Sequence, residues 1–266
     1  MKDLGVAKKI LGMMIDRDRS RSTLKVHQTP YLQKLVTKYG MSECKPVTMP
    51  LANHFILTKS QCPKSPVETI KMEIVPYSNL IGSVMYVMIS TRPDLAFAIS
   101  LLSRFMSNPG SDHWIALKWV LRYINCTACI GLEYCKRTST LDLVGFVDSD
   151  FAGDRHSRKS TTAYCFTLGG NCISWESQLQ PLVALSMTEA EYVALADGFK
   201  EAIWMQGLLT ETELTDSKVT IFSDSQSAIL LSKNPIYHER TKHVDMRFYF
   251  IRDLITRRQI DLTGSH

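Results

Sequence analysis

The chain has 266 residues, of which 45% are hydrophobic and 21% charged, so it is long enough for one large or two modest soluble domains. Its longest apolar run, Leu80 to Ile89, is interrupted by Gly82 and Ser83 and reaches about half the length that a bilayer span needs, which predicts no membrane segment. Residues 1–22 contain no sustained apolar region and no small-residue cleavage site, so no conventional secretory signal is expected.

The net charge is compatible with a nucleic-acid partner, and the cysteines favour an intracellular location. A formal charge of +5 and a pI near 8.8 are compatible with nucleic acid, because phosphates attract clustered lysines and arginines. Seven thinly spread cysteines favour a reducing, intracellular compartment over a disulfide framework. Cys126 and Cys129 form a lone CxxC near Cys135, and without a second such pair we expect packing there rather than zinc.

Residues 1–138 are expected to form a mainly helical first domain. The segment from Cys44 to Pro76 carries five prolines and little periodicity, which favours an extended connection. Beyond it, apolar periodicity broken by Pro93 and Gly110 predicts helices. Their expected ranges are Tyr77–Ile89, Asp94–Met106 and Trp114–Ile124.

Residues 139–266 are expected to form a second domain that begins with strands. Leu141 to Val147 has the pattern of a largely buried strand, and Asp148 follows it. Gly169-Gly170-Asn171 lies between two short strand-like runs, Ala163–Leu168 and Cys172–Trp175, which indicates a hairpin. A helix, a strand, two helices and a last strand follow, at Met187–Leu209, Val219–Ser223, Ser225–Ser232, Val244–Thr256 and Gln259–Leu262. The predicted fold class is therefore α/β, a mixed sheet with flanking helices.

Three acidic residues fall where such a sheet would gather them. Asp148 is expected at the end of the first strand, Glu191 in the first turns of the long helix, and Asp224 at the end of a later strand. Carboxylates held together repel one another unless cations lie between them, and two hard cations such as Mg²⁺ are the usual solution. The chemistry that follows is phosphodiester hydrolysis, in which one metal activates water and the other stabilises the leaving oxygen.

The second half contains the stretches FVDSDFAGDRHSRKSTTAYCFTLGG, ISWESQLQPLVALSMTEAEYVALADGFKEAIW, SDSQSAILLSKNP and HERTKHVDMRFYFIRD. They resemble the ribonuclease H region of copia-type retrotransposon Pol polyproteins. The resemblance implies a ribonuclease H-like fold and cleavage of the RNA strand of an RNA/DNA hybrid with two Mg²⁺ ions. It also implies that Asp148, Glu191 and Asp224 are three of the four metal-binding, catalytic acids.

The first half contains MKDLGVAKKILGM, PYSNLIGSVMYVMISTRPDLAFAISLLSRFMSNP and HWIALKWVLRYI. These stretches resemble the thumb and connection region that follows the reverse-transcriptase active site in the same polyproteins. The polymerase signature is a Tyr-x-Asp-Asp turn, and the chain contains no Asp-Asp pair. Residues 1–138 are therefore expected to be a C-terminal remnant of reverse transcriptase that does not polymerise by itself, and the rest of a Pol polyprotein is a candidate partner.

Two neighbouring acids compete for the same roles. Glu189 and Glu191 lie about 200° apart around a helix axis, so they cannot both face one site. Ser186 to Glu189 fits the S-x-x-E capping box, which leaves Glu191 for the metal. Asp150 shares a strand face with Asp148. Asp148 is preferred because it meets the strand end as the family pattern requires, and Asp150 stays an alternative ligand.

The fourth acid of the family follows the last strand, in an Asn-Pro-Ala-Asp-like segment. The sequence has no such segment after Ile260, so we expect a ribonuclease H-like domain that is truncated before its last helix, with activity weakened or lost. Asp245, in TKHVD, is the candidate substitute. The expected phosphate-binding residues are Arg155, Arg158, Lys159, Arg240 and Lys242. The tryptophans are expected to pack in the core rather than stack on bases.

The alternative function is not catalytic. Reading frames of this type are also labelled as secreted RxLR-type effectors of plant pathogens, which would bind host proteins inside host cells and suppress defence or cell death. The lack of a visible signal and of an Arg-x-Leu-Arg motif favours the intracellular nuclease. Substitution of Asp148 and Glu191 separates the two hypotheses, because an effector would not need the acids.

Overall fold

The computed structural model describes the chain except for residues 1–4, 137–139, 215–217, 234–244 and 265–266, together with the side chains of residues 245, 246 and 248. It divides into two compact units, Met1–Cys135 and Lys136–His266. Among the described helices, none alone is long and apolar enough to cross a membrane; one pair, Pro66–Glu73 and Tyr77–Ser90, bent by 47°, reaches that length and composition together.

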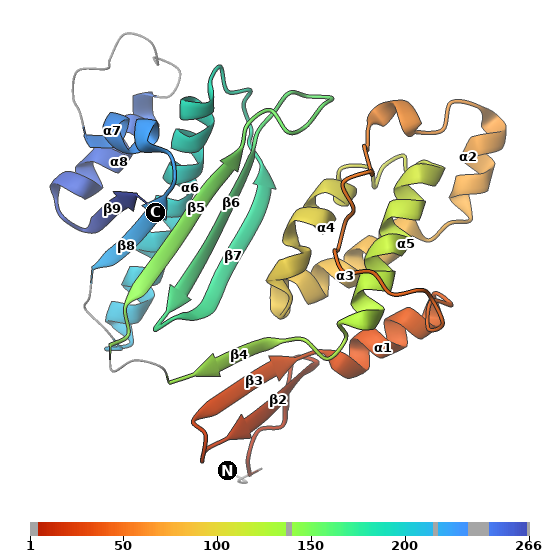
Figure 1. Ribbon diagram of the computed structural model, residues 1–266, viewed down its shortest axis with the longest axis horizontal. Coiled ribbons are helices and arrows are strands. Elements are labelled where there is room, and N and C mark those ends of the chain that lie inside the picture. Colours follow the sequence, from red (N-terminus) through yellow and green to blue (C-terminus); the bar gives the residue numbers. More distant parts are fainter. Residues whose placement is uncertain (1–4, 137–139, 215–217, 234–244, 265–266) are drawn as a thin grey trace. The chain divides into compact units, whose positions relative to one another are not determined.

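The first unit combines a small antiparallel sheet with a group of helices (Figure 1). The sheet has the order β1-β2-β3-β4, formed by β1 (Lys9–Ile10), β2 (Met13–Asp18), β3 (Thr23–His27) and β4 (Leu132–Cys135). The helices are α1 (Thr29–Lys38), α2 (Pro66–Glu73), α3 (Tyr77–Ser90), α4 (Ala96–Ser103) and α5 (Ser111–Cys126), with short 3-10 helices at Lys59–Gln61 and Pro93–Leu95.

The core of the first unit lies among α1, α3, α4 and α5, where residues such as Leu80 and Leu117 are fully buried. The buried side chain of Arg92 connects the turn after α3 with the C-terminal end of α5. Its Nη2 atom lies 2.7 Å from a carboxylate oxygen of Asp94, and its Nη1 atom donates to the carbonyl oxygen of Thr127 at 2.9 Å. The turn after α3 is thereby tied to the end of α5.

The first unit holds two sets of elements that the sequence did not predict. The segment expected as an extended connection contains α2, which begins where the Ser65 hydroxyl accepts a hydrogen bond from the Glu68 backbone and Pro66 occupies the first turn. None of its residues is buried, so no apolar stripe marks it. Strands β1 to β4 were also missed: β1, β2 and β3 pair with their neighbours in sequence, and the sheet is completed only by β4, at the C-terminal end of the unit.

The second unit is a mixed sheet in the order β7-β6-β5-β8-β9 (Figure 1). Its strands are β5 (Leu143–Asp150), β6 (Thr161–Leu168), β7 (Asn171–Leu179), β8 (Val219–Ser223) and β9 (Ile260–Gly264), and its helices are α6 (Met187–Glu211), α7 (Gln226–Lys233) and α8 (Asp245–Thr256). Strands β5, β6 and β7 are antiparallel, whereas β8 and β9 run parallel to β5. The predicted fold class, a mixed α/β sheet with flanking helices, is confirmed.

Helix α6 covers one face of this sheet because the side chains of β5 alternate. Leu143 and Val147 belong to the core that α6 shares, whereas Phe146 and Asp148 point to the opposite face and are exposed. The helix and the strand approach closely: a Cβ atom at Gly198 of α6 would lie 2.6 Å from the Cγ2 atom of Val147. Any larger residue at this position would require Val147 or the helix to shift.

One tryptophan contradicts the prediction of core packing. Trp204 of α6 is 62% exposed, whereas Trp114, Trp119 and Trp175 are partly buried. The reason is helical periodicity: Leu208, one turn further, is also exposed, so this stripe of α6 faces away from the sheet.

Candidate functional site

Two of the three predicted acids lie where β5 and β8 separate. The parallel pairing of these strands runs from Val144 opposite Thr220 to Phe146 opposite Phe222 and ends there. Asp148 and Asp224 each come two residues later, so they occupy matching positions on the same face of the sheet. One detail differs from the prediction, since β5 continues to Asp150 and Asp148 is not its last residue.

The start of α6 brings in the third acid. Ser186 is the N-cap and accepts a hydrogen bond from the backbone N–H of Glu189 at 3.2 Å. The Glu189 carboxylate in turn accepts a hydrogen bond from the backbone N–H of Leu185 at 2.7 Å. Glu189 is thereby held at the helix start, as the capping argument predicts, and Glu191 is the acid that reaches the sheet.

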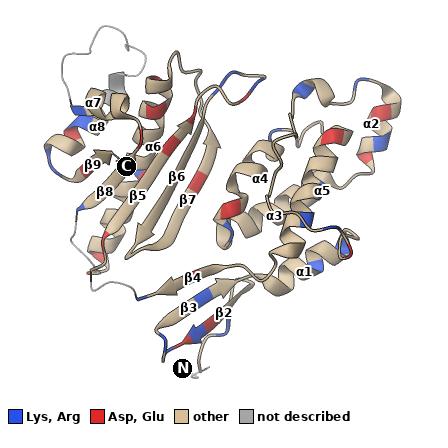
Figure 2. Ribbon diagram, viewed as in Figure 1, with Lys and Arg blue, Asp and Glu red and all other residues tan. Residues whose placement is uncertain are grey.

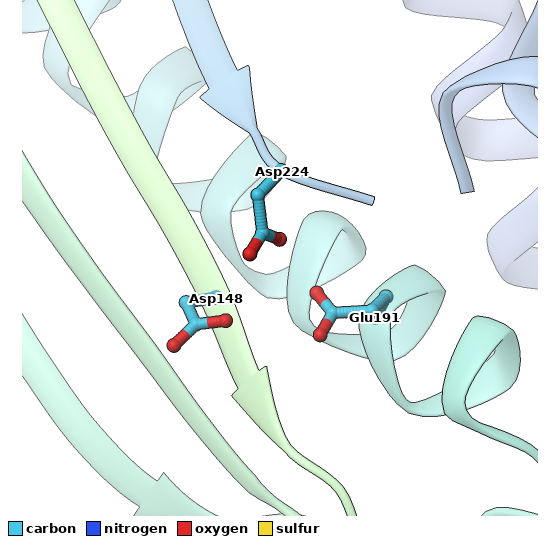
Figure 3. A group of neighbouring side chains, drawn as sticks. All are labelled: Asp148, Glu191 and Asp224. Atoms are coloured by element: carbon cyan, nitrogen blue, oxygen red, sulfur yellow. The ribbon is translucent and has the colours of Figure 1, made fainter. Parts of the chain in front are cut away.

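The carboxylates of Asp148, Glu191 and Asp224 form one cluster (Figure 3). Each offers an oxygen, and these oxygens lie within 4.8 Å of one another. Asp150 is not part of the cluster: its carboxylate lies beside Gly153, where an added Cβ atom would come within 1.7 Å of it. Asp245 lies outside the residues whose side chains are described.

The electrostatics of the cluster centre on Glu191. Burial raises the pKa of its carboxyl group to about 7, and the negative charges of Asp148 and Asp224 add to this rise. A hydrogen bond from the Ser149 backbone opposes it weakly. The Oε2 atom of Glu191 is buried and has no hydrogen-bond partner among the described residues.

This arrangement fits a divalent cation. An oxygen-rich cluster of three acids is the donor set that Mg²⁺ and similar hard cations prefer, and a buried carboxylate oxygen without a partner is an open ligand position. Asp148, Glu191 and Asp224 are therefore the residues that could hold such an ion. Cys126 and Cys129 are exposed and join no metal-binding group among the described residues.

The basic residues predicted to bind phosphate fall into two groups. Arg155 and Arg158 are exposed in the loop between β5 and β6, which Figure 2 shows beyond the end of the sheet. Asp154 organises this loop by accepting a hydrogen bond from the backbone of His156 at 2.9 Å. Lys159 is partly buried, and its ammonium donates to the carbonyl oxygen of Pro181 at 2.7 Å. Arg240 and Lys242 lie outside the described residues.

Sequence reasoning missed an aromatic pair beside the acids. The rings of Phe146 and Phe222 stack with centroids 5.6 Å apart and planes 18° apart. They line a cleft of about 370 Å³ together with Asp148 and Asp224. The signal was present in the sequence, because each phenylalanine precedes an acid by two positions on a strand.

Comparison with known proteins gives the family. No protein-family model matches the chain. A retrovirus-related Pol polyprotein from a tobacco (Nicotiana tabacum) transposon is 48% identical over 255 residues, which cover 96% of this chain and 19% of that protein. An uncharacterized mitochondrial protein of Arabidopsis thaliana is 37% identical over 77% of this chain and 80% of its own length. This chain belongs to the copia-type retrotransposon Pol family.

This Pol-family chain spans about a fifth of the tobacco polyprotein. It is also similar to a protein named as a secreted RxLR effector of Plasmopara viticola, with 52% identity over 50% of this chain and 94% of that protein. Among solved structures, a ribonuclease H1 isolated from compost is 16% identical with a TM-score of 0.36, covering 47% of this chain and 85% of that chain. That structural likeness is too slight to support a functional argument.

Proposed function

We propose that the second unit hydrolyses the RNA strand of RNA/DNA hybrids with Mg²⁺ held by Asp148, Glu191 and Asp224. The observation that carries the proposal is the cluster itself, in which carboxylates from strand β5, from the residue after β8 and from helix α6 lie within 4.8 Å of one another. Membership of the Pol family supports the choice of substrate. When two cations are bound, they supply an activated water and stabilise the leaving oxygen.

The protein's own residues have separable tasks in this proposal. Asp148 and Asp224 hold the cations from the face of the sheet that α6 does not cover. Glu191 completes the ligand set from the side of α6, where burial keeps water away from its Oε2 atom. Arg155 and Arg158 attract the phosphates of the hybrid to the same end of the sheet, because both are exposed and positively charged.

A cleavage assay tests the proposal with a matched control. The full chain is incubated with an end-labelled RNA/DNA hybrid and Mg²⁺, beside its Asp224→Asn and Asp150→Asn variants. We expect Asp224→Asn to lower the cleavage rate on the order of 100-fold, because a metal ligand is lost. Asp150→Asn removes an equal charge two residues from Asp148 and should retain activity. No cleavage by the wild type, or equal losses in both variants, would overturn the proposal.

The similarity to the Plasmopara viticola protein supports a second candidate, a non-catalytic effector that acts on host proteins. Its test is expression of the chain in plant leaf cells challenged with an inducer of cell death. If the chain is such an effector, its Asp148→Asn/Glu191→Gln double variant should suppress cell death as well as the wild type does. Loss of suppression in that variant, or no suppression by the wild type, would rule this candidate out.

A further inference from the structure

The groove beside the carboxylates has two chemically different parts. Phe146 and Phe222 form an aromatic floor, and Asp148 and Asp224 form one end. Ala163 and Cys165 of the neighbouring strand β6 extend the floor sideways. The register explains this layout, because Phe146 lies opposite Cys165 and Asp148 lies opposite Ala163, so all of these side chains share one face of the sheet.

The two phenylalanines face away from the core of the second unit. Phe146 is 47% exposed and Phe222 is partly buried, whereas Phe166 and Phe199 are fully buried between the sheet and α6. The stacked pair contributes nothing to the core that α6 shares, although neighbouring aromatic rings on adjacent strands stabilise the sheet. Each ring lies two residues before a metal-binding candidate and lines the same cleft as that candidate.

We infer that Phe146 and Phe222 form a stacking platform for the nucleotide of the RNA strand next to the phosphodiester at the carboxylates. This inference rests on the proposed function. A ligand that fills the whole groove needs a flat, apolar part over the rings and an anionic part at the cation site. A nucleotide joins these two parts in one unit, and an unpaired base of any sequence stacks on aromatic rings, so the base that occupies the platform is one turned out of the hybrid helix. The cleft volume of about 370 Å³ matches one such unit rather than a longer segment.

The test measures binding separately from cleavage. Fluorescence anisotropy follows a labelled RNA/DNA hybrid with the full chain and with Ca²⁺ in place of Mg²⁺. Phe146→Ala and Phe222→Ala should each weaken binding about 10-fold, the effect of losing one base-stacking contact. Phe146→Tyr keeps the ring and should bind as the wild type does. Trp204→Ala removes a more exposed aromatic ring from α6 and should leave binding unchanged, and thermal melts verify that each variant folds.

A modified probe distinguishes stacking from a general loss of affinity. Hybrids that lack one base of the RNA strand, scanned position by position, should bind the wild type more weakly at one position. That loss of affinity should vanish in the Phe146→Ala/Phe222→Ala variant, because the rings on which the base stacks are absent. Equal penalties in both proteins would overturn the inference and show that the hybrid rests elsewhere.

The outcomes separate this inference from the proposed function. Ring-dependent binding without cleavage by the wild type would sustain the platform and reject the nuclease. Cleavage and binding that are unchanged in both alanine variants would sustain the nuclease and reject the platform. A wild type that binds no hybrid rejects the platform outright, and the groove would then serve a protein side chain or a second copy of the chain.

Discussion

Glu191 illustrates what a single residue contributes to the site. Local rules favour it over Glu189, because helix geometry separates the two and the Ser186 cap engages Glu189. The same rules could not assign its raised pKa, which depends on burial under the sheet and on acids far away in the sequence. Asp150 was likewise left open by sequence, because only the folded loop turns its carboxylate toward Gly153.

The raised pKa of Glu191 predicts a pH-dependent stability difference. Its pKa is about 7 in the folded chain against an ordinary value of 4.5, so ionisation disfavours the fold as pH rises through this window. Glu191→Gln removes this cost. In EDTA, the variant should match the wild type below pH 4.5 and exceed its unfolding free energy by about 3 kcal/mol above pH 7. Urea titrations measure this, with Glu211→Gln on the exposed part of α6 as the control. A difference that does not grow with pH would contradict the assignment.

Cys165 and Cys172 allow a second prediction at this scale. Their sulfur atoms lie 3.5 Å apart on β6 and β7, and a hydrogen bond from the Cys172 thiol lowers the pKa of Cys165 to about 7. The pKa of Cys172 is raised by the same contact. Iodoacetamide should therefore alkylate Cys165 before Cys172 near neutral pH. The Cys172→Ala variant should slow that reaction, and peptide mass spectrometry reads both. Faster labelling of Cys172 would show that the Cys165 thiol, and not the Cys172 thiol, donates the hydrogen bond between them.

At the scale of elements, the fit of α6 against β5 sets the position of Glu191 relative to the two aspartates. The alternation along β5 and the long periodicity of α6 made both elements predictable. The close contact at Gly198 was not predictable, because nothing in the sequence says which glycine of the helix meets Val147. The small sheet of the first unit was missed for a related reason: β3 pairs with a strand that lies far along the chain.

The contact at Gly198 gives a prediction with an internal control. Gly198→Ala would place a Cβ atom 2.6 Å from Val147, so we expect the unfolding free energy to fall by about 1–3 kcal/mol. Gly207→Ala on the same helix meets no atom within 4 Å and should stabilise the helix by up to about 1 kcal/mol. Thermal unfolding of both variants measures the contrast. Equal shifts in the two variants would mean that α6 lies further from β5.

At the scale of the whole molecule, a basic chain of a Pol family presents an acidic cluster beside a basic loop. The net charge of +5 alone does not identify a partner, and the proposal of an RNA/DNA hybrid rests on the similarity to Pol polyproteins. The structure adds that Arg155 and Arg158 are exposed, whereas Lys159 is engaged with Pro181.

Salt dependence of hybrid binding tests the role of this loop. Each phosphate contact that is lost should reduce the slope of log affinity against log salt by about 1, so Arg155→Ala/Arg158→Ala should reduce it by about 2. Arg257→Ala serves as the control, because Arg257 already pairs with Asp253 at 2.9 Å. An unchanged slope in the double variant would place the phosphates away from this loop.

The metal dependence of hybrid cleavage tests the central claim most directly. The chain is stripped with EDTA, Mg²⁺ is titrated back, and the cleavage rate is compared with that of Asp148→Asn and Glu191→Gln. We predict no cleavage without metal, recovery in the wild type as Mg²⁺ rises, and little recovery in either variant. Cleavage that survives EDTA, or that both variants recover in full, would contradict the assignment of this cluster as the catalytic site.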